Sequence, residues 1–201
     1  MKIAIDGPAG SGKSTIAKLI AKNLNITYID TGAMYRAVTL YFMDKNIPAN
    51  DLDSIKHELP NIELEFIDNQ MHMNQKNVSL EIRTPRVTNN VSNYAKIDII
   101  REDLQNKQKF IALKQSVIMD GRDIGTVVLK DADFKFFLVA TVLERARRRL
   151  IDLNREGYQM DINLLIEEIE RRDAIDASRD HSPLKKADDA IEIDTSKPVS
   201  Y

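Results

Sequence analysis

Residues 7–14 read Gly7-Pro8-Ala9-Gly10-Ser11-Gly12-Lys13-Ser14. Two glycines five positions apart, followed by a lysine and a hydroxyl residue, form the pattern of a phosphate-binding loop. The apolar run over residues 1–5 predicts a buried strand before the loop, and a helix is expected from Ser14 onward. This order directs several backbone N–H groups and the positive end of a helix at one point. The stretch therefore predicts an α/β fold that binds a nucleoside triphosphate.

Two side chains of the loop have expected roles. Lys13 supplies a cation for the β- and γ-phosphates, and Ser14 supplies a hydroxyl for Mg²⁺. A glycine turn that matches by chance is the alternative, which the strand and helix on either side argue against. The residues expected to bind ATP are Gly7, Pro8, Ala9, Gly10, Ser11, Gly12, Lys13, Ser14 and Thr15.

Composition excludes several other classes of function. The chain has 201 residues, which predicts one domain or one domain with an insertion. A net charge of −2 gives no general attraction for nucleic acid or an anionic membrane, and the lack of cysteine excludes disulfides and thiolate metal sites. We expect a cytoplasmic protein with no nucleic-acid or membrane partner, and we expect a monomer.

Strand and helix patterns alternate along most of the chain. Apolar runs over residues 27–30, 117–120, 134–139 and 190–194 predict strands, and helices are expected over 14–24 and 33–44. This alternation predicts a parallel sheet of about five strands with helices on both faces. Between residues 62 and 82 apolar residues instead recur at every second position, which predicts an antiparallel insertion.

These patterns divide the chain into three parts. We expect a core of residues 1–53, 92–140 and 180–201, an antiparallel insertion of residues 54–91, and a basic helical lid region of residues 141–179.

The ends of the predicted parallel strands mark the candidate site, because ligands bind there in open parallel sheets. Asp120 ends an apolar run, where phosphate-loop enzymes keep a carboxylate that holds Mg²⁺ directly or through water. A surface turn is the alternative, since Asp and Gly favour turns. Arg36 and Arg122 in one cleft would bind a second phosphate, which would favour transfer between nucleotides over hydrolysis.

The lid region is rich in arginine. Thr141 and Glu144 have the spacing of a helix capping box, and Arg172, Asp176 and Arg179 share one face of a later helix. An exposed helix with surface ion pairs is one interpretation. The other is a lid that brings arginines over the transferring phosphoryl group and excludes water.

Four blocks together resemble the bacterial cytidylate kinases, within the nucleoside monophosphate kinase family of P-loop proteins. The resemblance covers residues 1–195 and rests on the phosphate loop, Asp30-Thr31-Gly32-Ala33-Met34-Tyr35-Arg36, Asp120-Gly121-Arg122-Asp123-Ile124-Gly125-Thr126-Val127-Val128 and Ser182-Pro183-Leu184. It implies transfer of the γ-phosphoryl group of ATP to CMP or dCMP with Mg²⁺. It also implies a C-terminal helix after Ser196, which Pro198 discourages.

The resemblance also implies roles for individual residues. Thr31, Arg36 and Arg122 would lie at the acceptor phosphate, and Ser92, Arg101 and Asp123 would read cytosine. Arg172 and Asp176 would hold the sugar hydroxyls, and Arg179 would close the site over the phosphates. The residues expected to act in catalysis are Lys13, Arg122, Arg172 and Arg179, with Ser14 and Asp120 at the metal.

Three other functions are alternatives to this interpretation. A kinase for another nucleoside monophosphate or a small metabolite would share the loop and lid but would not need a cytosine reader. A GTP-binding switch would need an Asn-Lys-x-Asp motif, whereas residues 106–109 end in lysine. A nucleic-acid-binding module would require basic and aromatic residues interleaved, a pattern that the sequence lacks.

Overall fold

The computed structural model describes residues 1–155 and 157–197. These residues form two compact units. The phosphate-loop unit comprises residues 1–27 and the described residues from Ser116 onward, and the middle unit comprises residues 28–115. Pro198, which discourages the C-terminal helix that the resemblance implies, lies outside the described residues.

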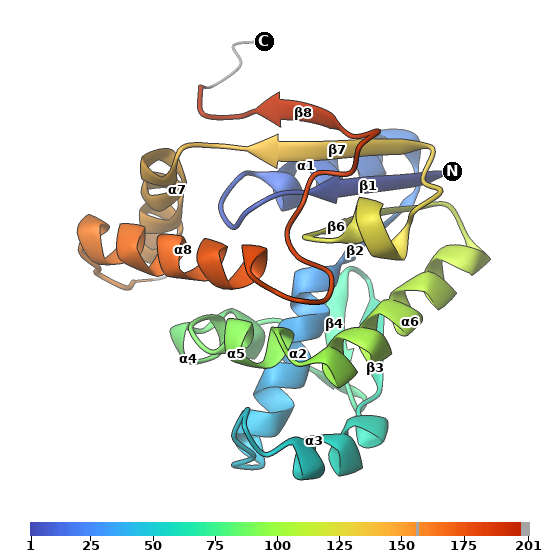
Figure 1. The fold of residues 1–201 in the computed structure, drawn as a ribbon, viewed down its shortest axis with the longest axis vertical. Coiled ribbons are helices and arrows are strands. Elements are labelled where there is room, and N and C mark those ends of the chain that lie inside the picture. Colours follow the sequence, from blue (N-terminus) through green and yellow to red (C-terminus); the bar gives the residue numbers. More distant parts are fainter. Residues whose placement is uncertain (156, 198–201) are drawn as a thin grey trace. The chain divides into compact units, whose positions relative to one another are not determined.

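The phosphate-loop unit is built on parallel strands. Their bounds are β1 (Lys2–Asp6), β6 (Val117–Gly121), β7 (Phe134–Val139) and β8 (Ile191–Asp194), and β2 (Thr27–Asp30) begins in the same unit. The sheet order is β2-β6-β1-β7-β8, and Figure 1 shows β1, β7 and β8 side by side. The predicted parallel sheet of about five strands is therefore confirmed.

The strands at the centre of the sheet are buried almost continuously. Ile3, Ala4 and Ile5 of β1 and Val117–Met119 of β6 are all buried. Such runs are typical of parallel strands that are covered on both faces. At their carboxyl ends, Ile5 pairs with Asp120 and Asp6 with Gly121 in the register of β1 and β6.

Helices α1 (Lys13–Leu24), α7 (Val142–Arg155) and α8 (Ile162–Ala177) and the short π-helix η3 (Ile124–Val128) belong to the same unit. The predicted cap at Thr141 is present, since its Oγ1 accepts a hydrogen bond from the N–H of Glu144 at 3.3 Å. Helices α7 and α8 pack together through Ala146, Leu153, Leu165 and Ile169. The predicted pair of helices is thus confirmed as a packed hairpin.

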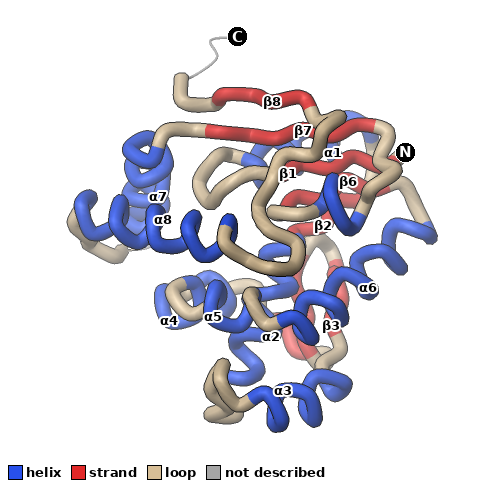
Figure 2. Tube along the Cα trace, in the orientation of Figure 1, coloured by secondary structure: helices blue, strands red, loops and turns tan. Residues whose placement is uncertain are grey.

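The middle unit is mostly helical, with a small antiparallel sheet (Figure 2). Its strands are β3 (Leu64–Ile67), β4 (Gln70–Met73) and β5 (Lys76–Asn77), in the order β3-β4-β5. Its helical segments are α2 (Thr31–Asp44), α3 (Leu52–Glu58), η1 (Leu59–Asn61), η2 (Glu81–Arg83), α4 (Pro85–Thr88), α5 (Val91–Ala95) and α6 (Asp98–Lys114). The predicted antiparallel strands are confirmed.

The strand predicted from the alternation of apolar residues over residues 78–82 was wrong. Val78 and Ile82 are buried, but Leu80 between them is 83% exposed. The N–H of Ile82 donates to the carbonyl of Val78 at 3.0 Å, so the chain makes a helical turn there. Residues four positions apart share one face of a helix as well as one face of a strand. The spacing of Val78 and Ile82 therefore fits both structures, and the chain forms the helical turn.

Among the described residues, no helix has both the length and the apolar character needed to span a membrane.

Candidate nucleotide-binding site

The backbone of the phosphate loop takes conformations that require glycine. Gly7, Gly10 and Gly12 have φ values of 144°, 78° and 86°. A Cβ atom at Gly7 would lie 2.1 Å from the carbonyl oxygen of Leu138 in β7. The loop therefore lies directly against the neighbouring strand, and its three glycines are needed for its shape.

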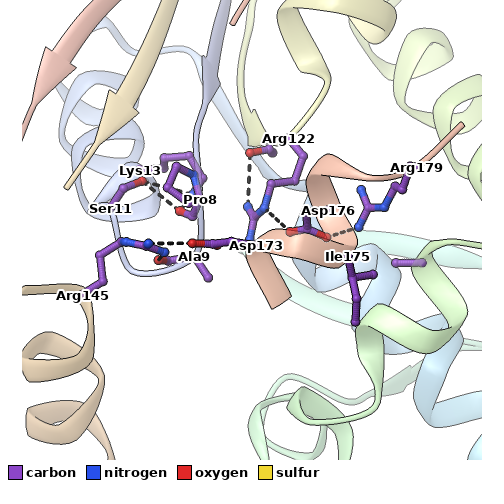
Figure 3. A network of polar contacts seen from close by, with 12 residues as sticks. Pro8, Ala9, Ser11, Lys13, Arg122, Arg145, Asp173, Ile175, Asp176 and Arg179 are labelled. Atoms are coloured by element: carbon purple, nitrogen blue, oxygen red, sulfur yellow. Dashed lines mark hydrogen bonds and ion pairs between the residues drawn. The ribbon is translucent and has the colours of Figure 1, made fainter. Parts of the chain in front are cut away.

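Lys13 begins α1 and is folded back onto the loop (Figure 3). Its Nζ donates to the carbonyl of Pro8 at 2.7 Å and to Ser11 Oγ at 3.4 Å. Burial, together with the nearby guanidinium of Arg122, lowers the pKa of Lys13 to about 7, while Asp120 and Asp6 act in the opposite direction. A phosphate anion bound beside this buried lysine would stabilise the charged form of its ammonium group.

Ser14 and Asp120 are in direct contact. Ser14 Oγ donates to Asp120 Oδ2 at 2.7 Å, which joins the start of α1 to the end of β6. A hydroxyl and a carboxylate are the hard oxygen donors that Mg²⁺ prefers, and Mg²⁺ is usually held by few protein ligands. The two side chains thus fit the metal role expected of them.

Arg122, Asp176 and Arg179 form a buried charge cluster in the same unit. Arg122 Nε donates to Asp176 Oδ2 at 2.8 Å, and Arg179 pairs with the other carboxylate oxygen (Figure 3). Burial favours a higher pKa for Asp176, but Arg122, Arg179 and Arg172 together hold its pKa below the ordinary value. Three of the predicted site residues are therefore gathered around the carboxylate of a fourth, Asp176.

Two arginines of α7 contact the phosphate loop itself. Arg145 is buried and donates to the carbonyls of Ala9 at 3.2 Å and Ala140 at 3.0 Å and to Asp173 at 2.6 Å. Arg148 contacts the carbonyls of Gly10 and Thr195. The sequence marked this helix only as basic and did not distinguish these two positions from Arg147 and Arg149.

Asp6 is a third residue that sequence reasoning left out of the site. Its carboxylate is buried at the end of β1 and accepts hydrogen bonds from the N–H groups of Ile124 at 2.8 Å and Gly125 at 2.7 Å. Burial raises its pKa to about 6, against the effect of these two hydrogen bonds. The signal that singled out Asp120, an acid at the end of an apolar strand, is equally present at Asp6.

The other predicted binding residues lie in the middle unit. Thr31 begins α2, two residues before the predicted start of this helix, and Arg36 of α2 pairs with Asp30 at 3.1 Å. Ser92 is buried in α5. Arg101 of α6 is buried, donates to the carbonyl of Ala95 at 2.9 Å and lies 5.4 Å from the ring centre of Tyr35. Helices α2, α5 and α6 contact one another, so the middle unit gathers these side chains within one group of helices.

The buried Asp6 makes a prediction about stability. Because its pKa is about 6 in the folded protein and near 4 in the unfolded chain, the folded state binds the proton more tightly. The carboxylate therefore costs no stability well below pH 4, and its cost grows to about 3 kcal/mol once the pH is above the folded pKa of about 6. Asp6→Asn does not titrate, so its unfolding free energy relative to wild type should rise by about 2 kcal/mol between pH 4 and pH 7. Urea unfolding of both proteins across this range measures the difference, and a difference independent of pH would contradict the prediction.

A glycine loop between a parallel strand and a helix, with a buried lysine and a serine–aspartate pair beside it, defines a P-loop nucleotide-binding protein. A family model described as cytidylate kinase matches residues 3–200, and the chain belongs to the cytidylate kinase family. The family expected from the sequence is therefore confirmed.

Curated relatives agree with this assignment. A cytidylate kinase of Clostridioides difficile is 52% identical over 193 residues, which cover 96% of this chain and 89% of the relative. One from Fusobacterium nucleatum is 51% identical, with 96% and 88% covered. The crystal structure of an uncharacterized protein from Eubacterium ventriosum superposes with a TM-score of 0.51 at 16% identity, covering 98% of this chain and 89% of that one, and supports the fold alone.

Proposed function

We propose that this protein is a cytidylate kinase, which transfers the γ-phosphoryl group of ATP to CMP or dCMP and produces ADP with CDP or dCDP. Family membership supports the proposal, and one structural observation carries it. The arginine cluster around Asp176 includes Arg122, which follows β6 two residues after Asp120, the carboxylate that contacts Ser14 of the phosphate loop. A phosphate loop with further buried cations beside it suits a reaction that brings two phosphate groups together.

The donor nucleotide would be held by the phosphate loop. Its N–H groups and the positive end of α1 would surround the phosphates of ATP, and Lys13 would turn from Pro8 toward the β- and γ-phosphates. Ser14 and Asp120 would hold Mg²⁺, the second through water or directly. When bound, Mg²⁺ would neutralise negative charge on the phosphates, in addition to the N–H dipoles of the loop.

The acceptor would be held by its phosphate and its sugar. Arg36 and Arg122 would bind the phosphate of CMP, with Thr31 nearby, and Arg172 and Asp176 would hold the sugar hydroxyls. An oxygen of this phosphate would attack the γ-phosphorus while the bond to ADP breaks. Positioning and neutralisation by Lys13, Arg122, Arg172 and Arg179 would supply most of the catalysis, with no covalent intermediate on the protein.

Cytosine would be read by groups that complement its edge. The carboxylate of Asp123 can accept from the N4 amine, while Arg101 can donate to N3 and O2, and Ser92 adds a hydroxyl. In uracil a carbonyl replaces the amine, and Asp123 would then face an acceptor. We expect kcat/KM for CMP to exceed that for UMP by at least about tenfold, which lies within the range of about 1–3 kcal/mol that one matched base contact contributes. Steady-state kinetics with both nucleotides measures the ratio, and equal values would remove this role for Asp123.

One assay tests the whole proposal. Release of ADP from ATP, measured by a coupled assay with CMP, dCMP, UMP or AMP as acceptor, should be fast with CMP or dCMP and should stop when EDTA removes divalent cations. Fast turnover with a different nucleotide or a small metabolite, and none with CMP or dCMP, would replace the proposal by another P-loop kinase. We also propose that the protein is a monomer, which its mass in sedimentation equilibrium would test.

A further inference from the structure

The carboxylate of Asp6 has no role in the mechanism above, yet it binds the segment that carries Arg122 and Asp123. Asp6 ends β1 opposite Gly121 of β6. Its Oδ1 accepts from the N–H of Ile124 at 2.8 Å and its Oδ2 from the N–H of Gly125 at 2.7 Å. Because each oxygen holds one of two successive N–H groups, the segment after Asp123 is fixed in both position and orientation against β1.

These two N–H groups are the first of the π-helix η3 (Ile124–Val128). The first N–H groups of a helix have no partner within the helix, and the side chain of the residue just before the helix commonly satisfies them. That residue is Asp123, and its side chain makes no such bond. Asp6 performs the capping from a different strand, so the Asp123 carboxylate is not turned back onto the start of the helix.

We propose that Asp6 is a positioning residue for base recognition, which holds the Asp123 carboxylate in the orientation that accepts the N4 amine of cytosine. The inference rests on the proposed function, in which Asp123 reads this amine. It adds Asp6, at the end of β1, to the residues that determine which nucleotide is accepted.

The electrostatics of Asp6 support a role other than stability. Burial and, to a smaller degree, the neighbouring Asp123 raise its pKa to about 6, against the two backbone hydrogen bonds and Lys13, which act in the opposite direction. Strongly shifted pKa values cluster at functional sites, so this shift agrees with the role that the hydrogen bonds of Asp6 indicate.

The test is the ratio of kcat/KM for CMP to kcat/KM for UMP in Asp6→Asn. An asparagine has one acceptor oxygen and places an NH₂ group against the second N–H, so one of the two hydrogen bonds is lost. We expect the CMP-to-UMP ratio to fall by about tenfold, the effect of one buried hydrogen bond. A purely structural role would reduce the amount of active enzyme and lower both values equally, so it would leave the ratio unchanged.

Gly125→Ala perturbs the same contact from the other side and covers the case in which Asp6→Asn does not fold. A Cβ atom at Gly125 would lie 3.3 Å from Asp6 Oδ2 and 3.3 Å from Lys135 Cδ. We expect the ratio to fall in this variant too. The matched control is Asp133→Asn, since Asp133 Oδ2 accepts from the N–H of Lys2 at 2.7 Å at the other end of β1 and is exposed. This variant should keep the wild-type ratio.

The outcomes separate the inference from the proposed function. A wild-type ratio in both Asp6→Asn and Gly125→Ala would overturn the positioning role, as would an equal fall in Asp133→Asn. If the wild-type enzyme itself does not phosphorylate CMP, the proposed function fails first. A reduced ratio in Asp6→Asn or Gly125→Ala, with the control unchanged, supports the inference.

Discussion

Replacing Lys13 with methionine should lower kcat for CMP phosphorylation by about a thousandfold, the upper range for removing one preorganised charge from a transition state. The ammonium group is the buried cation of the phosphate loop, and its Nζ lies 2.7 Å from the carbonyl of Pro8 at the point where the loop turns. Methionine keeps most of the length and apolar volume of the side chain, so the change removes the charge while the loop retains its packing. Rapid-quench measurement of a single turnover at saturating ATP isolates this effect from product release.

Lys22→Met is the matched control for this prediction. Lys22 belongs to the same helix, α1, but lies in its last turn and is exposed. Its replacement should leave kcat within about twofold of wild type, because exposed charges distant from the site contribute little. A loss in Lys13→Met no larger than that in the control would contradict the proposed role of the lysine.

Arg122→Ala should lower kcat/KM for CMP by about thirtyfold to several thousandfold, which corresponds to an increase of about 2–5 kcal/mol in the activation free energy. The variant loses a proposed ligand of the acceptor phosphate. It also removes the 2.8 Å hydrogen bond to Asp176, a carboxylate that is only 2% exposed. Truncating one partner of a buried pair is costly mainly because the other charge remains buried. The affinity for ATP should change far less, because the phosphate loop and its lysine remain in place.

Isothermal titration with ATP and with CMP separates the two sides of this prediction. Arg86→Ala provides the comparison, since Arg86 forms an ion pair with Asp44 at 2.9 Å in which both side chains are more than half exposed. That variant should bind both nucleotides like wild type. Loss of ATP affinity with CMP affinity intact in Arg122→Ala would assign Arg122 to the donor side instead.

The sequence was sufficient where the signal is local. The phosphate loop is set by glycines within eight consecutive residues, and the strand over 134–139 was predicted with the bounds it has in the structure. The helix over residues 31–44 was placed two residues late because its cap, Asp30, was assigned to the preceding strand only, whereas its side chain also accepts from the N–H of Ala33.

What the sequence could not supply were contacts between distant parts of the chain. Asp6 binds N–H groups that lie 118 and 119 residues away, and Arg145 binds the carbonyl of Ala9 at a separation of 136 residues. Backbone groups carry no residue-specific pattern, so a side chain that binds them leaves no matching partner in the sequence. The ion pair of Arg122 with Asp176 was not predicted either, although each of the two residues was assigned to the site from the sequence.

The position of Arg145 has a mechanical consequence for the helical hairpin of α7 and α8. Its guanidinium is joined at once to the carbonyl of Ala9 in the phosphate loop and to Asp173 in α8. Moving α7 away from the loop must break the first of these bonds, and moving α8 away from α7 must break the second. Breaking either of these hydrogen bonds would leave a charge without its partner and with little access to water. The hairpin can therefore move easily only if the loop backbone moves with it. Arg145, together with Arg148 at the carbonyl of Gly10, therefore couples movement of the hairpin to movement of the phosphate loop.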